Sequence, residues 1–245
     1  SGTDLSPYCD DHHGLAVTAA ISRYAYATLV PRDDREIHLR DLDLDQHVVI
    51  PSIRAIELDG ELDLIKACIR RAGPTRGFEL TTYSEIPASA GLADQAAMAV
   101  LVCALCTQYE FGGFDPAAMA QMAAAVQREE MNGAGGRQEH FATADGGLQF
   151  LQFVEDEVRR EPANLADETL RQLEKNLLLV DTGRPARSAN VEGEIQAACA
   201  AGDRAVLEGL HGVKAVARQM QTALREGDLE EFAAKHDLRI LTIAD

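Results

Sequence analysis

The sequence predicts an α/β (α+β) protein with two domains. The chain has 245 residues and 46% of them are apolar, so it can bury a large core. Runs rich in β-branched and aromatic residues alternate with helical runs as far as the Gly146-Gly147 pair, and helical runs dominate after it. We therefore expect an N-terminal α/β domain over residues 1–146 and a helix-rich α+β domain over residues 147–245.

Strands are expected where apolar, β-branched and aromatic residues alternate over short stretches. Residues 15–31 form the longest such stretch, which suits one long strand or two. The other expected strands cover residues 37–40, 53–58, 78–83, 148–154 and 177–181.

Helices are expected where the apolar period lengthens and capping residues mark the ends. Asp115 followed by Pro116 is typical of a helix start, and Asp203 and Asp228 are N-cap candidates for the last two helices. Gly73 followed by Pro74 closes an earlier helix. The expected helices cover residues 61–71, 95–109, 115 onward, 164–174, 191–201, 204–225 and 229–236.

The charge limits the partners that the protein can bind. The net charge is −17 with only 23 basic residues, so the chain repels nucleic acid and anionic membranes, and we expect neither as a partner. An anionic substrate would need a local basic or dipolar pocket. The sequence has no run of about 18 apolar residues, so we expect no membrane span, and no signal peptide is recognisable. We expect a cytoplasmic protein.

The five cysteines fit a reducing compartment and buried free thiols. Cys103 and Cys106 have the spacing of a redox or zinc pair, but they lie in an apolar helix without a second ligand pair, so we interpret them as packing thiols. His12, His13 and His140 likewise lack ligands at metal-binding spacing. The acidic run over residues 41–45 is interpreted as a solvated loop or edge.

Four segments have residue types that point to phosphate and sugar chemistry. The first reads GTDLSPY over residues 2–8, and the second reads IPASAGLADQ over residues 86–95, at the start of the apolar helix. The third reads GRQEHFA over residues 136–142 and is followed by the Gly146-Gly147 pair. The fourth reads TGRPARS over residues 182–188. A glycine-rich turn that opens a helix presents backbone N–H groups and the positive helix end to phosphate.

In this order and spacing the segments resemble the GHMP kinases, which include galactokinase, homoserine, mevalonate and phosphomevalonate kinases. The resemblance is to the heptose-7-phosphate and fucose-type sugar kinases, and it covers almost the whole chain. It implies a GHMP-kinase-like two-domain fold of mixed sheets with helices packed on them. It also implies the transfer of phosphate from ATP, with Mg²⁺, to a hydroxyl of a sugar or sugar phosphate. A homodimer is an open alternative to a monomer. The glycine-rich third motif of the family is absent, and we expect residues beyond both ends of this sequence.

The resemblance assigns the acceptor side of the site to four residues. Asp4 matches the sugar-binding Asp of the family, with Thr3 beside it. Arg187 and Ser188 match a basic segment that could hold a substrate phosphate, for which a bidentate Arg is well suited. Without the resemblance, Asp4 could equally stabilise a turn and Arg187 could be an ordinary surface cation.

On the nucleotide side, the chain departs from the family pattern G-L-G-S-S. The expected nucleotide-binding residues are Ala90, Gly91, Leu92, Ala93, Asp94 and Gln95. Ala93 replaces a glycine that allows close backbone approach, and Asp94 places a carboxylate where a triphosphate is expected. Taken by itself, Asp94 is most simply interpreted as the N-cap of the helix. The metal-binding Glu of the family falls at Gln127, which can offer an oxygen to Mg²⁺ but no charge.

The catalytic Asp of the family falls at Glu139, and Arg137 could stabilise the transferred charge. The extra methylene of Glu139 could cost on the order of 100-fold in rate. Glu139 could equally be a solvated carboxylate. Two hypotheses follow. The chain is a sugar or sugar-phosphate kinase, or it is a repurposed kinase fold that binds a sugar ligand or a partner without phosphoryl transfer.

Overall fold

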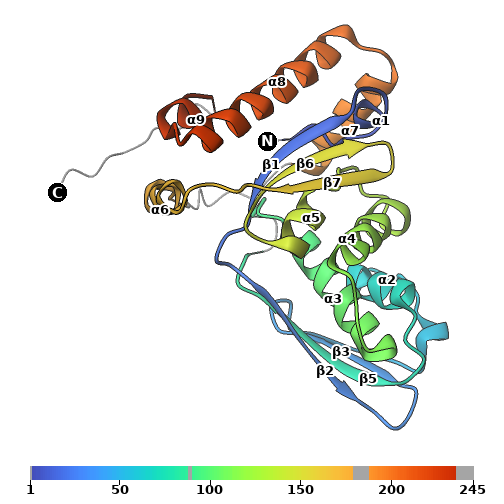
Figure 1. Ribbon diagram of the computed structural model, residues 1–245. Coiled ribbons are helices and arrows are strands. Elements are labelled where there is room, and N and C mark those ends of the chain that lie inside the picture. Colours follow the sequence, from blue (N-terminus) through green and yellow to red (C-terminus); the bar gives the residue numbers. More distant parts are fainter. Residues whose placement is uncertain (1, 88–89, 179–187, 236–245) are drawn as a thin grey trace. The chain divides into compact units, whose positions relative to one another are not determined.

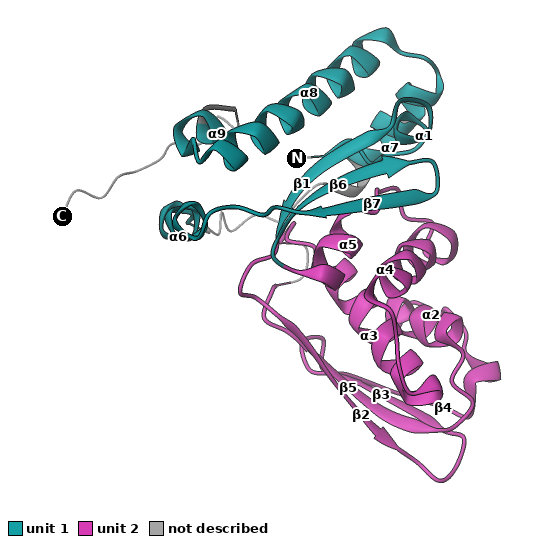
Figure 2. Ribbon diagram, in the orientation of Figure 1, with its two compact units in different colours: residues 1–19, 147–184, 190–245 teal, residues 20–146, 185–189 magenta. Residues whose placement is uncertain are grey.

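The computed structural model describes residues 2–87, 90–178 and 188–235 (Figure 1). Contacts divide the chain into two compact units (Figure 2). Unit 1 contains residues 1–19, 147–184 and 190–245, and unit 2 contains residues 20–146 and 185–189. Residues 1–19 thus share a unit with the C-terminal part of the chain. The expected domains over residues 1–146 and 147–245 stay a prediction, since compact units need not fold independently.

Unit 2 is built on a four-stranded mixed sheet. The strand order is β2 (Ala25–Pro31), β5 (Phe78–Ser84), β3 (Ile37–Asp41) and β4 (Gln46–Ile50). β3 runs parallel to β5, and the other neighbours are antiparallel. Alternate side chains point to opposite faces, so Ile37, Leu39 and Leu80 are buried while Arg40 and Glu79 lie on the other face.

Helices cover one face of this sheet (Figure 1). They are η1 (Ile53–Ala55, a 3₁₀-helix), α2 (Asp63–Ala72), α3 (Asp94–Phe111), α4 (Pro116–Ala125), η2 (Val126–Glu130, a π-helix) and α5 (Gln138–Asp145). α3 is apolar nearly all round because it packs against β2, α2, α4 and α5. Its residues Val102 and Cys103 join Leu80 and Cys68 in one buried cluster.

Unit 1 is built on the antiparallel sheet of β1 (Gly14–Ala19), β6 (Leu148–Val154) and β7 (Glu157–Pro162), with β6 in the middle. Its helices are α1 (Tyr8–His12), α6 (Asp167–Asn176), most of α7 (Ser188–Ala200), α8 (Arg204–Glu226) and α9 (Leu229–Lys235). α8 packs on β1. It does so through a stripe that includes Ala217, Met220 and Leu224, at a spacing of three to four residues.

Most predicted elements are confirmed. Residues 15–31 form the two strands β1 and β2, and β3, β5 and β6 lie where alternation predicted them. Gly73 ends α2 in the left-handed conformation, and the side chains of Asp115, Asp203 and Asp228 accept backbone hydrogen bonds at the starts of α4, α8 and α9. The five cysteines are free and buried, as expected.

Three expectations about elements are corrected. The predicted strand over residues 53–58 is wrong, since this stretch begins with the 3₁₀-helix η1. Leu177 and Leu178 are not in a strand, and the rest of the predicted strand lies outside the described residues. The acidic run is exposed at residues 42–45, but Asp41 is only 6% exposed and accepts a hydrogen bond from the Thr82 hydroxyl at 2.8 Å. Within the described part of the chain, no helix is long and apolar enough to cross a membrane.

Candidate active site

The start of α3 is a left-handed turn. Ala93 is the N-cap residue with φ 61° and ψ 28°, and Gly91 also has a positive φ of 74°. No side chain caps this helix within the described residues. The prediction that Asp94 is the N-cap is therefore wrong. Asp94 is the first helical residue, whereas a capping side chain must precede the helix, usually on an extended backbone, to reach the second or third N–H.

The two positive φ angles explain the spacing of glycines in the family pattern. Glycine occupies the left-handed region without steric penalty, whereas a Cβ there crowds the following carbonyl oxygen. Gly91 meets this requirement, and Ala93 adopts the same conformation with a side chain. The turn thus keeps the backbone geometry of a glycine-rich loop although one glycine is replaced.

Gln127 joins this loop to a second helix end. It lies in the π-helix η2, and its Nε2 donates to Oε1 of Gln95 at 3.5 Å. Its Oε1 lies against Nε2 of His140, in α5. A carbonyl oxygen only accepts, so the hydrogen-bond network assigns the ring proton of His140 to Nε2. Three segments far apart in the sequence, around residues 95, 127 and 140, therefore meet in unit 2.

His140 is a neutral group in this cluster. It is 3% exposed, and burial lowers its pKa to about 4, an effect only partly offset by the backbone of Arg137. The imidazole therefore orients Gln127 rather than supplying positive charge. The sequence reading considered His140 only as a metal ligand and missed this contact. Within the described residues, no three His, Cys, Asp or Glu side chains are grouped as a metal site.

The first turn of α5 carries the two residues expected at the catalytic position. Arg137 is the N-cap residue and is 6% exposed, whereas Glu139 is exposed in the first turn. A carboxylate is favourable near a helix N-terminus because it faces the positive end of the helix dipole. The catalytic role of Glu139 stays a prediction, as does that of Arg137.

The acceptor-side residues Thr3 and Asp4 lie in unit 1, beside the start of β1. Thr3 is fully buried, and its Oγ1 accepts from the backbone N–H of Leu15 at 3.0 Å. A Cβ on Gly14 would lie 2.4 Å from the Thr3 carbonyl oxygen, so this close approach requires glycine. Thr3 therefore fixes the position of Asp4, which is 4% exposed.

A second carboxylate accompanies Asp4. The pKa of Glu192, in α7, is raised by burial and by the negative charge of Asp4. The sequence reading missed Glu192, because it occupies an ordinary helical position with no motif around it. Of the fourth segment, Arg187 lies outside the described residues, and Ser188 is described only as the first residue of α7.

Comparison with known proteins identifies a family domain and a curated relative. The GHMP kinases N terminal domain matches residues 62–147, which include α3, η2 and α5. The D-glycero-alpha-D-manno-heptose 7-phosphate kinase of Campylobacter jejuni subsp. jejuni serotype O:2 is 27% identical over 238 residues. The alignment covers 95% of this chain and 70% of the relative.

Solved structures agree with the sequence comparison. A D-glycero-D-manno-heptose 1-phosphate kinase from Bacteroides thetaiotaomicron superposes with a TM-score of 0.80 at 26% identity, over 95% of this chain and 71% of its own. The galactokinase of Lactococcus lactis, solved with galactose, has a TM-score of 0.66 at 18% identity, over 90% and 67% of the two chains, and it supports the fold alone. The chain therefore has the fold of the solved GHMP kinases, and its residues 62–147 match the N-terminal domain of that family.

Proposed function

We propose that the protein is an ATP-dependent sugar-phosphate kinase that transfers the γ-phosphate of ATP to a hydroxyl of a phosphorylated heptose. One observation carries the proposal. The chain aligns over 95% of its length with a heptose 7-phosphate kinase, so the alignment extends over both units. The remaining support comes from what each group of residues can do chemically.

The N-terminus of α3 suits the phosphates of ATP. The first N–H groups of a helix lack intrahelical partners, and the helix dipole adds positive potential at the same point. α3 has 18 residues and, in the described part of the chain, no side-chain cap to occupy these groups. An anion at this turn would therefore be held by backbone donors.

The side chains around this turn also fit Mg²⁺. The ion is usually held by one or two carboxylates together with substrate phosphates. Asp94 offers a carboxylate in the first turn of α3, and its side chain has no hydrogen bond or ion pair with the described residues. Gln127 keeps a second lone pair on Oε1 beyond the one facing His140. Asp94 and Gln127 would hold Mg²⁺, which neutralises charge that develops on the transferred phosphoryl group.

The sugar would be bound by Asp4, whose buried carboxylate can accept hydrogen bonds from hydroxyl groups. Glu139 would orient the attacking hydroxyl and Arg137 would stabilise negative charge, while Arg187 and Ser188 would hold the phosphate already on the sugar. We propose a cytoplasmic enzyme with small-molecule partners and neither nucleic acid nor membrane as a partner. A homodimer stays a prediction.

The function is tested by measuring ADP release with Mg-ATP and heptose 7-phosphate, heptose 1-phosphate or unphosphorylated heptose. We expect turnover with a heptose phosphate, and thermal stabilisation by Mg-ATP through mass action. The Asp4→Asn variant should raise KM for the sugar at least tenfold and leave KM for ATP unchanged. No turnover with any of the three sugars, combined with stabilisation by sugar phosphates but not by nucleotide, would support a binding protein and contradict the kinase.

Substitutions that restore the family residues should raise kcat if the protein is a weakened kinase, and they should produce no turnover if the fold is repurposed. Asp94→Ser with Gln127→Glu returns the carboxylate to the position that it has in the family, and Glu139→Asp removes the extra methylene. In a kinase, Glu139→Asp should raise kcat, by up to on the order of 100-fold. Glu157→Asp is the matched control, because it shortens an exposed Glu of β7 in unit 1, and it should leave kcat unchanged.

A further inference from the structure

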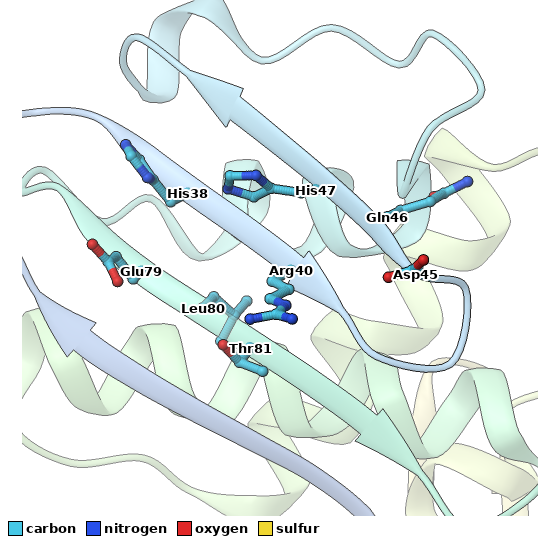
Figure 3. Close-up of a pocket in the computed structure, with 8 residues that line it drawn as sticks. All are labelled: His38, Arg40, Asp45, Gln46, His47, Glu79, Leu80 and Thr81. Carbon is cyan, nitrogen blue, oxygen red and sulfur yellow. The ribbon is translucent and has the colours of Figure 1, made fainter.

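The outer face of the unit 2 sheet carries a hollow that the proposed function does not use (Figure 3). Its volume is about 460 Å³, and residues of β3, β4, β5 and the β3–β4 turn line it. The lining residues are His38, Arg40, Asp45, Gln46, His47, Glu79, Leu80 and Thr81. α3 packs against the other face of this sheet, where Leu39 and Leu80 join its buried cluster. The hollow is therefore separated by the sheet from the helix body that carries the nucleotide loop.

A row of three donors crosses the floor of the hollow. The strand register pairs Arg40 with His47 on β4 and with Thr81 on β5. Figure 3 shows the Arg40 guanidinium directed toward Thr81. A second imidazole, that of His38, lies 6.1 Å from that of His47 between ring centroids. A guanidinium between an imidazole and a hydroxyl offers several N–H and O–H groups to one anion.

Arg40 has no direct charged partner among the described residues. In the described part of the chain its guanidinium forms no ion pair and no hydrogen bond. By contrast, the neighbouring Arg32 contacts Asp34, Glu36 and Glu79 at 2.5–3.3 Å. The side chain of Arg40 is exposed, so its guanidinium is available to an anionic ligand that enters the hollow.

The edges of the hollow carry hydrogen-bond acceptors, in contrast to the donors on its floor. Glu79 lies at one edge, where its Oε1 accepts from Arg32 Nη1 at 2.8 Å, and Asp45 lies near the β3–β4 turn. Gln46, by contrast, shares the helix-covered face of β4 with Val48 and Ile50, and its Oε1 is buried there. The carboxylate oxygens of Glu79 and Asp45 accept hydrogen bonds from hydroxyl groups, and they would repel a plain anion. The lining thus suits a ligand with one anionic group and several hydroxyls.

We propose that this hollow is a second ligand site, separate from the nucleotide loop, that binds a phosphorylated sugar. Arg40, His47 and Thr81 hold the phosphate, and Glu79 and Asp45 accept from the sugar hydroxyls. The volume lies within the range of small-molecule sites. Because the sheet separates the hollow from α3, a sugar phosphate bound here acts as an effector and not as the acceptor of the phosphoryl group.

The site is tested by NMR on the full chain with mannose 6-phosphate as the probe, using the ring C–H signals of His38 and His47. We expect both signals to shift in a saturable manner at millimolar probe. The Arg40→Gln variant should weaken this binding at least tenfold. Arg54→Gln is the matched control, since Arg54 is also exposed and unpaired within the described residues but does not line the hollow, and it should bind like the wild type.

Two comparisons define what would overturn the proposal. Inorganic phosphate should bind at least tenfold more weakly than mannose 6-phosphate, and mannose should shift neither ring signal. Equal binding of inorganic phosphate and the sugar phosphate would refute recognition of the hydroxyls. Absence of any ring shift, or an unchanged shift in Arg40→Gln, would refute the site whether or not the protein is a kinase.

Discussion

The left-handed conformation of Ala93 predicts the sign of a change in stability. Replacing Ala93 by Gly should stabilise the protein, because φ is 61° at this position and alanine costs roughly 1–2 kcal/mol there. Glycine loses about 0.5–1 kcal/mol more backbone entropy on folding, which offsets part of the gain. The net stabilisation is therefore about 0.5–1 kcal/mol. Thermal unfolding followed by circular dichroism should show a Tm higher by ~2 °C, and urea unfolding should give the free energy directly.

The same chemical change four residues later is the control. Ala97 lies inside α3, where alanine is the best residue and glycine is worse by about 1 kcal/mol. Ala97→Gly should therefore lower Tm, while Ala93→Gly raises it. If both variants are destabilised by similar amounts, the start of α3 is not left-handed at residue 93, and the glycine-loop interpretation of this turn is wrong.

Two further predictions concern stability. The pKa of His140 is about 4 in the folded state and 6.5 in the unfolded chain, so stability should be full above pH 6.5 and should fall by up to about 3 kcal/mol as pH drops toward 4. Urea midpoints between pH 4.5 and 7.5 should show this slope in the wild type, and a slope of the same size in His140→Gln would contradict it. The Asp203 side chain accepts from the N–H groups of Ala205 at 2.9 Å and Val206 at 3.2 Å, so Asp203→Ala should destabilise α8 by about 1 kcal/mol in urea unfolding. Asp203→Asn keeps an accepting oxygen and should lose much less.

Helices and strands that are marked by nearby residues, such as capping residues, could be predicted from the sequence. Strands that form only because they pair with a neighbouring strand could not. Asp115 followed by Pro116 fixes the start of α4 through groups within three residues of each other. Neither β4 nor β7 was predicted from the sequence. β7 reads Glu-Val-Arg-Arg-Glu-Pro, with little apolar alternation, and β4 has only five residues. Each becomes a strand because it pairs with a neighbour, β3 or β6, at the edge of a sheet.

The same distinction holds for the site. The match of Gly91 and Ala93 to a glycine-rich loop was readable from the sequence, and the structure supplies its reason in two positive φ angles. The contact of Gln127 with His140 joins residues 13 apart in different helices, and that with Gln95 spans 32 residues. No periodicity encodes such contacts, since they depend on how α3, η2 and α5 pack. The pairing of β1 with β6, which places residues 1–19 in unit 1, is equally long-range.

The position of Asp94 after the N-cap residue decides whether its carboxylate competes with phosphate at the start of α3. A carboxylate that caps its own helix is engaged with backbone N–H groups and competes with phosphate for them. Asp94 follows the N-cap residue, so those groups stay available and its carboxylate is not used by the helix. Gln127 meanwhile has one lone pair of its oxygen facing His140. By the resemblance, Gln127 replaces the metal-binding Glu of the family, while Asp94 brings a carboxylate to the proposed nucleotide turn. A negative side chain beside a triphosphate is unfavourable unless a divalent cation lies between them, so this turn suits ATP as its Mg²⁺ complex far better than free ATP.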